Sequence, residues 1–212
     1  MFRPRLRHRL TTRSAKRSKA DDYSQHPLGL NPFSMPDTLI RPSTDADLAA
    51  ITRIYAHHVL NGTGTFETSP PNEDDMRARR ADVLGKNLPW LVLEQHGVVR
   101  GFAYGNWFKP RPAYRFSVED SIYMANDAGG KGLGKLLMAE LLVQLERRGI
   151  RKVMAVIGDS ANTGSIGVHR SAGFEPVGVV EACGWKFGRW LDIVLMQKNL
   201  GAGSSTPPEG TQ

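Results

Sequence analysis

A glycine-rich segment near the middle of the chain, Gly129 to Lys135, constrains the possible folds more than any other feature of the sequence. A β-like run from Phe116 to Met124 precedes it, and a helix with apolar residues at helical spacing follows it, to about Arg148. A glycine-rich turn at the start of a helix presents free backbone N–H groups at the positive end of the helix dipole. The segment therefore predicts a strand–turn–helix unit that binds a phosphate or pyrophosphate group.

Three phosphate-binding motifs compete for this segment. The nucleotide-binding pattern G-x-x-x-x-G-K-[ST] fits from Gly129 to Lys135, but the next residue is Leu136, which has no hydroxyl for Mg²⁺. The dinucleotide pattern G-x-G-x-x-G fails because its sixth position is not glycine from either possible start. The third candidate is the acetyl-CoA loop of GNAT acyltransferases, (Arg/Gln)-x-x-G-x-(G/A), which fits at Gly132 and Gly134 with Gly129 in place of Arg or Gln. A glycine-rich turn that binds no ligand is the remaining alternative.

The formal net charge of +7 arises at one end of the chain. Residues 1–19 contain eight of the 28 basic residues and no acidic one, so the rest of the chain is nearly neutral, at about −1. We interpret residues 1–37 as a basic, disordered extension, or as the product of an upstream start codon with Met35 as the real start. Contact of this tail with nucleic acid or anionic lipid, and a transit peptide, are the alternatives.

The single cysteine, Cys183, excludes an intrachain disulfide and a cysteine metal cluster. No apolar run reaches the length of a membrane span. We therefore expect a cytoplasmic protein that contacts no membrane and holds no metal. At 212 residues the chain suits one domain with a proper core, which we place at residues 38–198, followed by a disordered C-terminal tail at 199–212.

Hydrophobic periodicity divides this domain into strands and helices. The predicted strands are 38–41, 90–94, 98–107, 116–124, 152–157, 176–182 and 191–197. The predicted helices begin after Thr44, at Glu73, after the glycine-rich segment and at about Gly164. Thr44 and Asp47 have the spacing of a capping box at the first of these helices. This order predicts an α/β sandwich around one mixed sheet.

Short motifs spread along the whole domain agree with the third candidate. They are Ile54-Tyr55-Ala56-His57, Thr65-Phe66-Glu67, Gly101-Phe102-Ala103-Tyr104, Ala113-Tyr114-Arg115, Val118-Glu119-Asp120-Ser121-Ile122-Tyr123, Val156-Ile157-Gly158, Asn162, Ser165, His169, Gly173-Phe174 and Lys186-Phe187-Gly188-Arg189-Trp190-Leu191-Asp192. Over about residues 38–198 the chain resembles the phosphinothricin N-acetyltransferase group of the GNAT superfamily. The resemblance implies the GNAT fold, with a central mixed, mostly antiparallel sheet flanked by helices. Departures from the group are Gly129, Ala56 and His58.

The resemblance also implies a reaction, which is acetyl transfer from acetyl-CoA to the amine of a small amino acid-like substrate. Phosphinothricin, methionine sulfone and methionine sulfoximine are substrates of this type. By position in the family, Glu119 is the base that deprotonates the amine, directly or through water, and His169 protonates the leaving thiolate. The structural alternatives are a salt-bridged carboxylate in a strand and an ordinary, partly buried histidine.

The candidate binding residues fall into two groups. The co-substrate group comprises Tyr123, Met124, Gly129, Gly130, Lys131, Gly132, Leu133, Gly134, Lys135, Asn162 and Ser165. Within it, a backbone N–H near Tyr123 or Met124 holds the oxyanion, and Asn162 binds the pantetheine arm or simply caps a helix. The acceptor group comprises Thr65, Phe66, Arg111, Tyr114 and Arg115. The arginines are included because an Arg fork is the natural partner of a carboxylate, and solvent-facing charges are the alternative.

Two other functions stay open at this point. One is acetylation of peptide or protein N-termini, which needs an open groove for a backbone. The other is a nucleic-acid-binding regulator that acts through residues 1–19, which the nearly neutral domain disfavours. We expect a homodimer, because this state is common among the proteins that the chain resembles, with the segment from Trp185 to Trp190 as a contributor.

Overall fold

The computed structural model describes residues 37–208. The predicted basic extension at 1–37, apart from Asp37, and the last four residues of the predicted tail lie outside this range. In the described part of the tail, Leu200 is buried and residues 201–206 form turns and bends. The predicted domain boundaries stay predictions.

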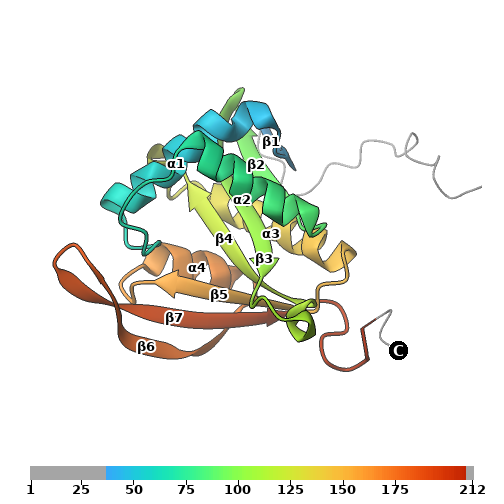
Figure 1. The fold of residues 1–212 in the computed structure, drawn as a ribbon. Helices are drawn as coiled ribbons and strands as arrows, with labels where there is room; N and C mark the ends of the chain where they lie inside the picture. The colour runs from blue at the N-terminus through green and yellow to red at the C-terminus, as the bar shows by residue number, and fades with distance from the viewer. Residues whose placement is uncertain (1–36, 209–212) are drawn as a thin grey trace, which may run out of the picture. The chain divides into compact units, whose positions relative to one another are not determined.

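A seven-stranded sheet forms the centre of the described residues, in the order β1-β2-β3-β4-β5-β7-β6 (Figure 1). The strands are β1 (Thr38–Pro42), β2 (Trp90–Gln95), β3 (Val98–Trp107), β4 (Ser117–Met124), β5 (Lys152–Gly158), β6 (Glu175–Lys186) and β7 (Arg189–Asn199). Every neighbouring pair in this sheet is antiparallel except β4 and β5, which are parallel. The predicted mixed, mostly antiparallel sheet is therefore confirmed.

Helices cover both faces of the sheet. They are α1 (Leu48–Asn61), α2 (Glu73–Gly85), α3 (Leu133–Arg147) and α4 (Thr163–Ser171). The ring of Tyr55 in α1 meets Tyr123 of β4, with ring centroids 4.9 Å apart. On the opposite face of the strands, a Cβ added to Gly105 of β3 would lie 2.8 Å from Leu145 of α3. Because successive residues of a strand face opposite sides, α1 and α3 pack on different faces (Figure 1).

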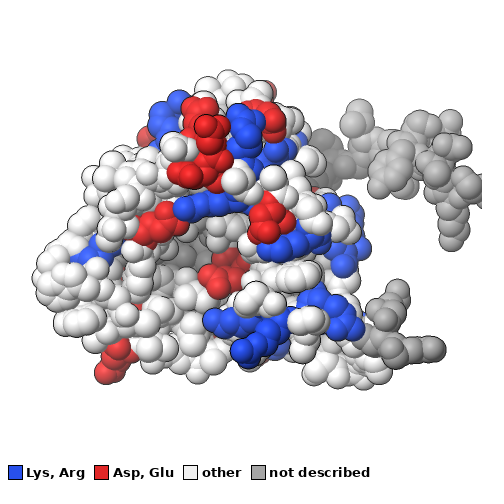
Figure 2. All heavy atoms as spheres, viewed as in Figure 1, with Lys and Arg blue, Asp and Glu red and all other residues white. Residues whose placement is uncertain are grey.

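The leucine-rich pattern of α3 explains its burial. Leu133, Leu137, Met138, Leu141 and Leu145 recur on one side of the helix and are at most 1% exposed. Each such side chain stabilises the fold by about 1.5–3 kcal/mol when it leaves water. By contrast, α2 is mostly polar, and Figure 2 shows Lys and Arg interspersed with Asp and Glu over it. Its charged side chains form ion pairs with residues that precede α2 in the sequence, as Arg79 does with Glu67.

The last two strands are longer than the sequence predicts. They continue past 182 and before 191 into a hairpin that turns at Phe187 and Gly188, both with positive φ, and pairs Trp185 with Trp190. Two positive-φ residues form the tight turn whose twist suits a hairpin. The glycines of this segment weaken its strand pattern, so periodicity alone ends the strands too early.

Strands β4 and β5 pair over only a short distance. Their register covers Ser117 to Glu119 against Lys152 to Met154, although β4 continues to Met124 and β5 to Gly158. Beyond Glu119 the two strands diverge, as the ribbon shows (Figure 1). The sheet therefore opens into a wedge in its middle.

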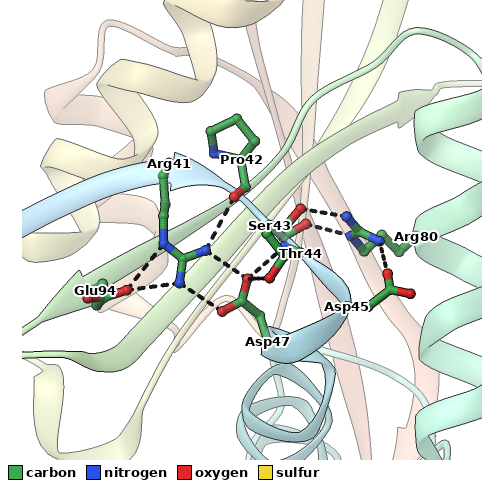
Figure 3. A network of polar contacts seen from close by, with 8 residues as sticks. All are labelled: Arg41, Pro42, Ser43, Thr44, Asp45, Asp47, Arg80 and Glu94. Atoms are coloured by element: carbon green, nitrogen blue, oxygen red, sulfur yellow. Dashed lines mark hydrogen bonds and ion pairs between the residues drawn. The ribbon is translucent and has the colours of Figure 1, made fainter.

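A polar network ties the start of α1 to the sheet (Figure 3). The Arg41 guanidinium donates to both carboxylate oxygens of Asp47, at 2.8 and 2.9 Å, and to Glu94 of β2 at 2.8 Å. Asp47 also accepts from the backbone N–H of Thr44 at 2.7 Å, which agrees with the predicted capping interaction. The hydrogen bonds from Arg41 outweigh burial and hold the pKa of Asp47 at about 2, below the usual 3.8.

This lowered pKa makes Asp47 a pH-dependent stabiliser. Its contribution is complete above about pH 4 and is lost as the pH falls toward 2, because the unfolded chain then binds a proton more readily than the folded one. We expect Asp47→Asn to cost roughly 2 kcal/mol of unfolding free energy at pH 7 and much less near pH 2. Urea titrations at both pH values measure this. Asp74→Asn, at a side chain 95% exposed, is the control, and an equal Asp47→Asn loss at both pH values contradicts the prediction.

Candidate active site

The wedge between β4 and β5 contains a cavity of about 1220 Å³. It is lined by both diverging strands, by the glycine-rich segment, by the start of α4 and by the loop after α1. Tyr55 and His58 of α1 close one side, and Val168 and His169 of α4 close the other. A concave site of this size at a break in a sheet suits a ligand larger than a typical small molecule.

Backbone groups of both strands face the wedge. The N–H of Ala125 bonds the carbonyl of Arg100 at 2.8 Å, and antiparallel hydrogen bonding alternates between residues. With Met124 opposite Gly101 in the register, the peptide groups of Met124 and Ile122 therefore point away from β3, toward the open side. The same alternation on β5 directs the peptide groups of Val156 and Gly158 there. A ligand that carries amides can bond both edges.

The glycine-rich segment lies at the wide end of the wedge, at the start of α3. Gly130 and Gly132 have φ of 74° and 75°, a conformation that side chains disfavour, so both positions require glycine. Gly132 is the N-cap of α3, and Gly134 lies in its first turn. Lys135 lines the cavity beside them. Free N–H groups, the positive helix end and one ammonium together form an anion site.

Two glycines let the loop after α1 approach the sheet. A Cβ on Gly158 of β5 would lie 2.2 Å from the carbonyl oxygen of Thr63, and one on Gly184 of β6 would lie 2.3 Å from the Phe66 ring. The buried Lys186 ammonium donates to the carbonyls of Gly62 and Thr65, at 2.8 and 2.7 Å. These contacts place Thr65 and Phe66 in the cavity wall, and their role at the acceptor end stays a prediction.

Glu119 lines the cavity at the closed end of the wedge. Burial raises the pKa of its carboxyl above the usual value, with a smaller contribution from the neighbouring Asp120, while Lys109 acts in the opposite direction. The structure shows no hydrogen bond or ion pair of this side chain with another residue in the range 37–208. The alternative of a salt-bridged carboxylate is therefore not supported within that range. A half-buried carboxyl whose pKa is raised suits a proton acceptor.

His169 is buried and forms a pair with Asp120. Its Nε2 lies 2.9 Å from Asp120 Oδ2, and its Nδ1 lies 2.8 Å from the backbone carbonyl of Ser165. Burial lowers the pKa of His169, but the hydrogen bond and charge of Asp120 outweigh it, so the pKa is raised overall. The sequence places His169 at the cavity, as the structure does, but gives no sign that both ring nitrogens are engaged.

The other predicted site residues divide into those at the cavity and those away from it. Asn162 accepts from the Ser165 N–H as the cap of α4, and both residues line the cavity, so the cap and a ligand contact are compatible. Lys131 donates to the Asp127 carbonyl outside the cavity. Arg111, Tyr114 and Arg115 also lie outside it, around the 3-10 turn Pro112–Tyr114 between β3 and β4.

Several cavity residues were not predicted from the sequence. They are Tyr55, His58, Tyr104, Asp120, Ser121 and Asp159. Tyr104 and Ser121 lie opposite each other in the β3–β4 register. Ser121 is two residues after Glu119, so strand alternation places both on the same face, and this signal is present in the sequence. His58 donates through Nε2 to the Met124 carbonyl at 2.8 Å, and burial lowers its pKa. No sequence pattern signals that long-range contact.

Comparison with known proteins agrees with this geometry. Residues 51–174 match the model of the acetyltransferase (GNAT) family, and the chain belongs to that family. It is 50% identical over 170 residues to a phosphinothricin N-acetyltransferase of Alcaligenes faecalis, covering 80% of this chain and 86% of the relative. It is 38% identical over 170 residues to an L-methionine sulfoximine/L-methionine sulfone acetyltransferase of Pseudomonas aeruginosa, covering 79% and 98%.

A solved structure agrees in fold. The phosphinothricin acetyltransferase of Sinorhizobium meliloti, in complex with AcCoA, superposes with a TM-score of 0.79 at 45% identity, covering 82% of this chain and 95% of that one. The family and fold expected from the sequence are thus confirmed. Within residues 37–208, no helix is long and apolar enough to cross a membrane. The same range contains no cluster of His, Cys, Asp and Glu suited to a metal ion.

Because the Phe66 ring packs closely on β6, we expect that only glycine fits at position 184 of that strand. We expect Gly184→Ala to destabilise the protein by about 1–3 kcal/mol, because the new methyl group must displace the Phe66 ring. Gly178→Ala on the same strand is the matched control, since a Cβ there meets nothing within 4 Å, and its effect should stay within about 0.5 kcal/mol. Chemical denaturation of both variants measures this, and equal losses contradict the prediction.

Proposed function

We propose that this chain is an acetyl-CoA-dependent N-acetyltransferase that acts on the amino group of a small amino acid-like substrate. Phosphinothricin, methionine sulfone and methionine sulfoximine define the type. The single observation that carries the proposal is the wedge, which joins an anion site at the start of α3 to a half-buried carboxyl at its closed end. The names of the relatives, at 50% and 38% identity, support the substrate type.

The two ends of the cavity suit the two substrates. The pyrophosphate of acetyl-CoA binds the first turn of α3 and Lys135, and its amide-containing arm runs between the peptide edges of β4 and β5. The acceptor binds on the face that carries Tyr55, Thr65 and Phe66, beside Glu119. A single cavity that contains both suits direct attack in a ternary complex.

The reaction then follows from the groups at the closed end. Glu119 takes a proton from the acceptor ammonium, directly or through a water, and the neutral amine attacks the thioester carbonyl carbon. The peptide N–H groups of Ile122 and Met124 face the wedge, and one of them bonds the resulting oxyanion, Ile122 being the nearer to the closed end. Collapse of the tetrahedral intermediate breaks the C–S bond and releases the CoA thiolate and the acetamide. The nitrogen loses its second proton to water, and Glu119 returns the first proton to water before the next turnover.

Binding of acetyl-CoA tests the anion site. We expect millimolar acetyl-CoA to raise the melting temperature of the wild type, because a ligand of the native state stabilises it by mass action. Gly132→Glu should abolish the shift, since its carboxylate repels the pyrophosphate. Gly149→Glu is the matched control, because Gly149 also has a positive φ, of 79°, but lies beyond the other end of α3. A shift that survives Gly132→Glu places the co-substrate elsewhere.

The pH dependence of the rate tests Glu119. Because a base must be deprotonated, kcat/KM should fall as the pH drops through the raised pKa of Glu119, at a pH above the usual 4.5 of a glutamate. We expect Glu119→Gln to lower kcat/KM about 10²–10⁴-fold near pH 7 and to lose less at high pH, where the amine deprotonates unaided. The affinity for acetyl-CoA should stay unchanged. Near wild-type rates at neutral pH would make the carboxylate structural and shift attention to another acceptor such as His57.

Acceptor identity is measured by release of the CoA thiol over a panel of amino acids that includes phosphinothricin and both methionine derivatives. Acetylation of these amino acids supports the proposal. Acetylation of peptide N-termini alone, with no turnover of the amino acids, overturns it.

We also place the protein in the cytoplasm, which a lone, exposed Cys183 suits.

A homodimer is part of this proposal, because the hairpin of β6 and β7 is unusually apolar on its surface. Val177, Val179, Trp185, Phe187 and Trp190 are each at least 52% exposed, and β6 is an edge strand. We expect a dimer in sedimentation at micromolar concentration and a monomer for Trp190→Glu. Val98→Glu, at an exposed valine of β3, is the control. A monomeric wild type contradicts this part of the proposal.

A further inference from the structure

The buried pair of Asp120 and His169 has a geometry that the proposed reaction does not use. Both side chains are almost fully buried, at 1% and 3% exposure. They join β4 to α4 across 49 residues of sequence, and Asp120 lies one residue beyond Glu119, the last position at which β4 pairs with β5. The pair therefore stands where the co-substrate arm, entering from the glycine-rich segment, reaches the acceptor.

The partners of the His169 ring fix where its protons are. The Ser165 carbonyl is only an acceptor, so Nδ1 carries a hydrogen and donates it at 2.8 Å. An ionised Asp120 is also only an acceptor, so Nε2 carries the second hydrogen at 2.9 Å. With Asp120 ionised, the ring is an imidazolium whose two N–H groups are both engaged within the protein. No N–H is left to donate to a ligand in the cavity.

The surroundings keep this charge in place. Within residues 37–208, Asp120 is the ionisable side chain that contacts the ring, and Phe174 meets the ring edge to face at 5.0 Å. Glu119, the next residue along β4, faces the other side of the sheet. Asp120 Oδ1 is buried with no hydrogen-bond partner among residues 37–208, which is costly. A pair that leaves one carboxylate oxygen unsatisfied is poorly explained by stability alone, since buried ion pairs seldom stabilise a fold over apolar packing.

We propose that Asp120 is a positioning residue that keeps His169 doubly protonated, so that His169 acts on the departing thiolate as a fixed positive charge and not as a proton donor. This rests on the proposed active site in the wedge. When the C–S bond breaks, the electron pair stays on sulfur, and the nearby imidazolium stabilises the thiolate. The sulfur takes its proton from water after departure, and the pair of Asp120 and His169 begins and ends each turnover in the same state.

Imidazole nitrogen chemical shifts of ¹⁵N-histidine-labelled protein test the charge directly. The signals of His169 are assigned by their loss in His169→Gln. We expect both nitrogens to be protonated from pH 6 to 8, with and without bound acetyl-CoA. In Asp120→Asn, one nitrogen should lose its proton within that range, because the raised pKa depends on Asp120. An unprotonated nitrogen in the wild type at pH 7 overturns the proposal, whether or not the enzyme is active.

Kinetics provide the second readout. We expect Asp120→Asn to lower kcat about 10–100-fold at pH 8 and less at pH 6, where the histidine recharges, with little change in the KM for acetyl-CoA. Asp47→Asn is the control, because that buried Asp pairs with Arg41 away from the cavity and should change stability but not the pH profile. An Asp120→Asn profile parallel to the wild type overturns the proposal. If Asp120→Asn does not fold, the chemical shifts of the wild type still decide. A wild type without acetyltransferase activity refutes the proposed function and leaves the charge state of His169 to those shifts.

Discussion

The short pairing of β4 with β5 is the constraint on which the rest of the structure depends. Parallel strands that stayed together to their ends would bond their peptide groups to each other and leave no room between them. Here the register stops at Glu119, and both strands continue for several residues with one edge unpaired. At about 3.3 Å per residue, the stretch of β4 from Asp120 to Met124 is about 13 Å long. The sheet thus provides a slot lined with backbone donors and acceptors.

Charge is distributed unevenly along this slot. The wide end offers the start of α3 and Lys135, while the closed end offers the acidic side chain of Glu119, since Asp120 is paired with His169. A ligand that is anionic at one end is therefore favoured with its phosphates outward and its other end toward Glu119. In the proposed reaction the same closed end favours an approaching ammonium, which must then give up a proton to become a nucleophile. Orientation and proton removal are then both consequences of one gradient of charge.

The parts of this site that are set by residues close together in the chain can be predicted from the sequence. The glycine-rich segment, the leucines of α3 and the alternation around Glu119 are readable because backbone conformation and periodicity act within a few residues. Contacts between distant residues leave no such pattern. The pairing of Asp120 with His169, the bond from His58 to the Met124 carbonyl and the grip of Lys186 on the loop after α1 each join distant segments. Arg111 and Arg115 were predicted from their chemistry and their position next to β4, but both lie outside the cavity.

The hydrogen bonds from Lys186 to the loop after α1 also determine when that loop can take its final position during synthesis. Its ammonium bonds carbonyls 121 and 124 residues earlier in the chain, and Gly184, two residues before it, seats the Phe66 ring. During synthesis the glycine-rich segment and its helix leave the ribosome well before this hairpin, because domains emerge from the N-terminal side. The cavity wall formed by Thr65 and Phe66 is therefore in place only in a chain whose C-terminal hairpin has been made and folded back. Under the proposed function, a nascent chain that already contains α3 has its anion site before it has the wall of its acceptor pocket.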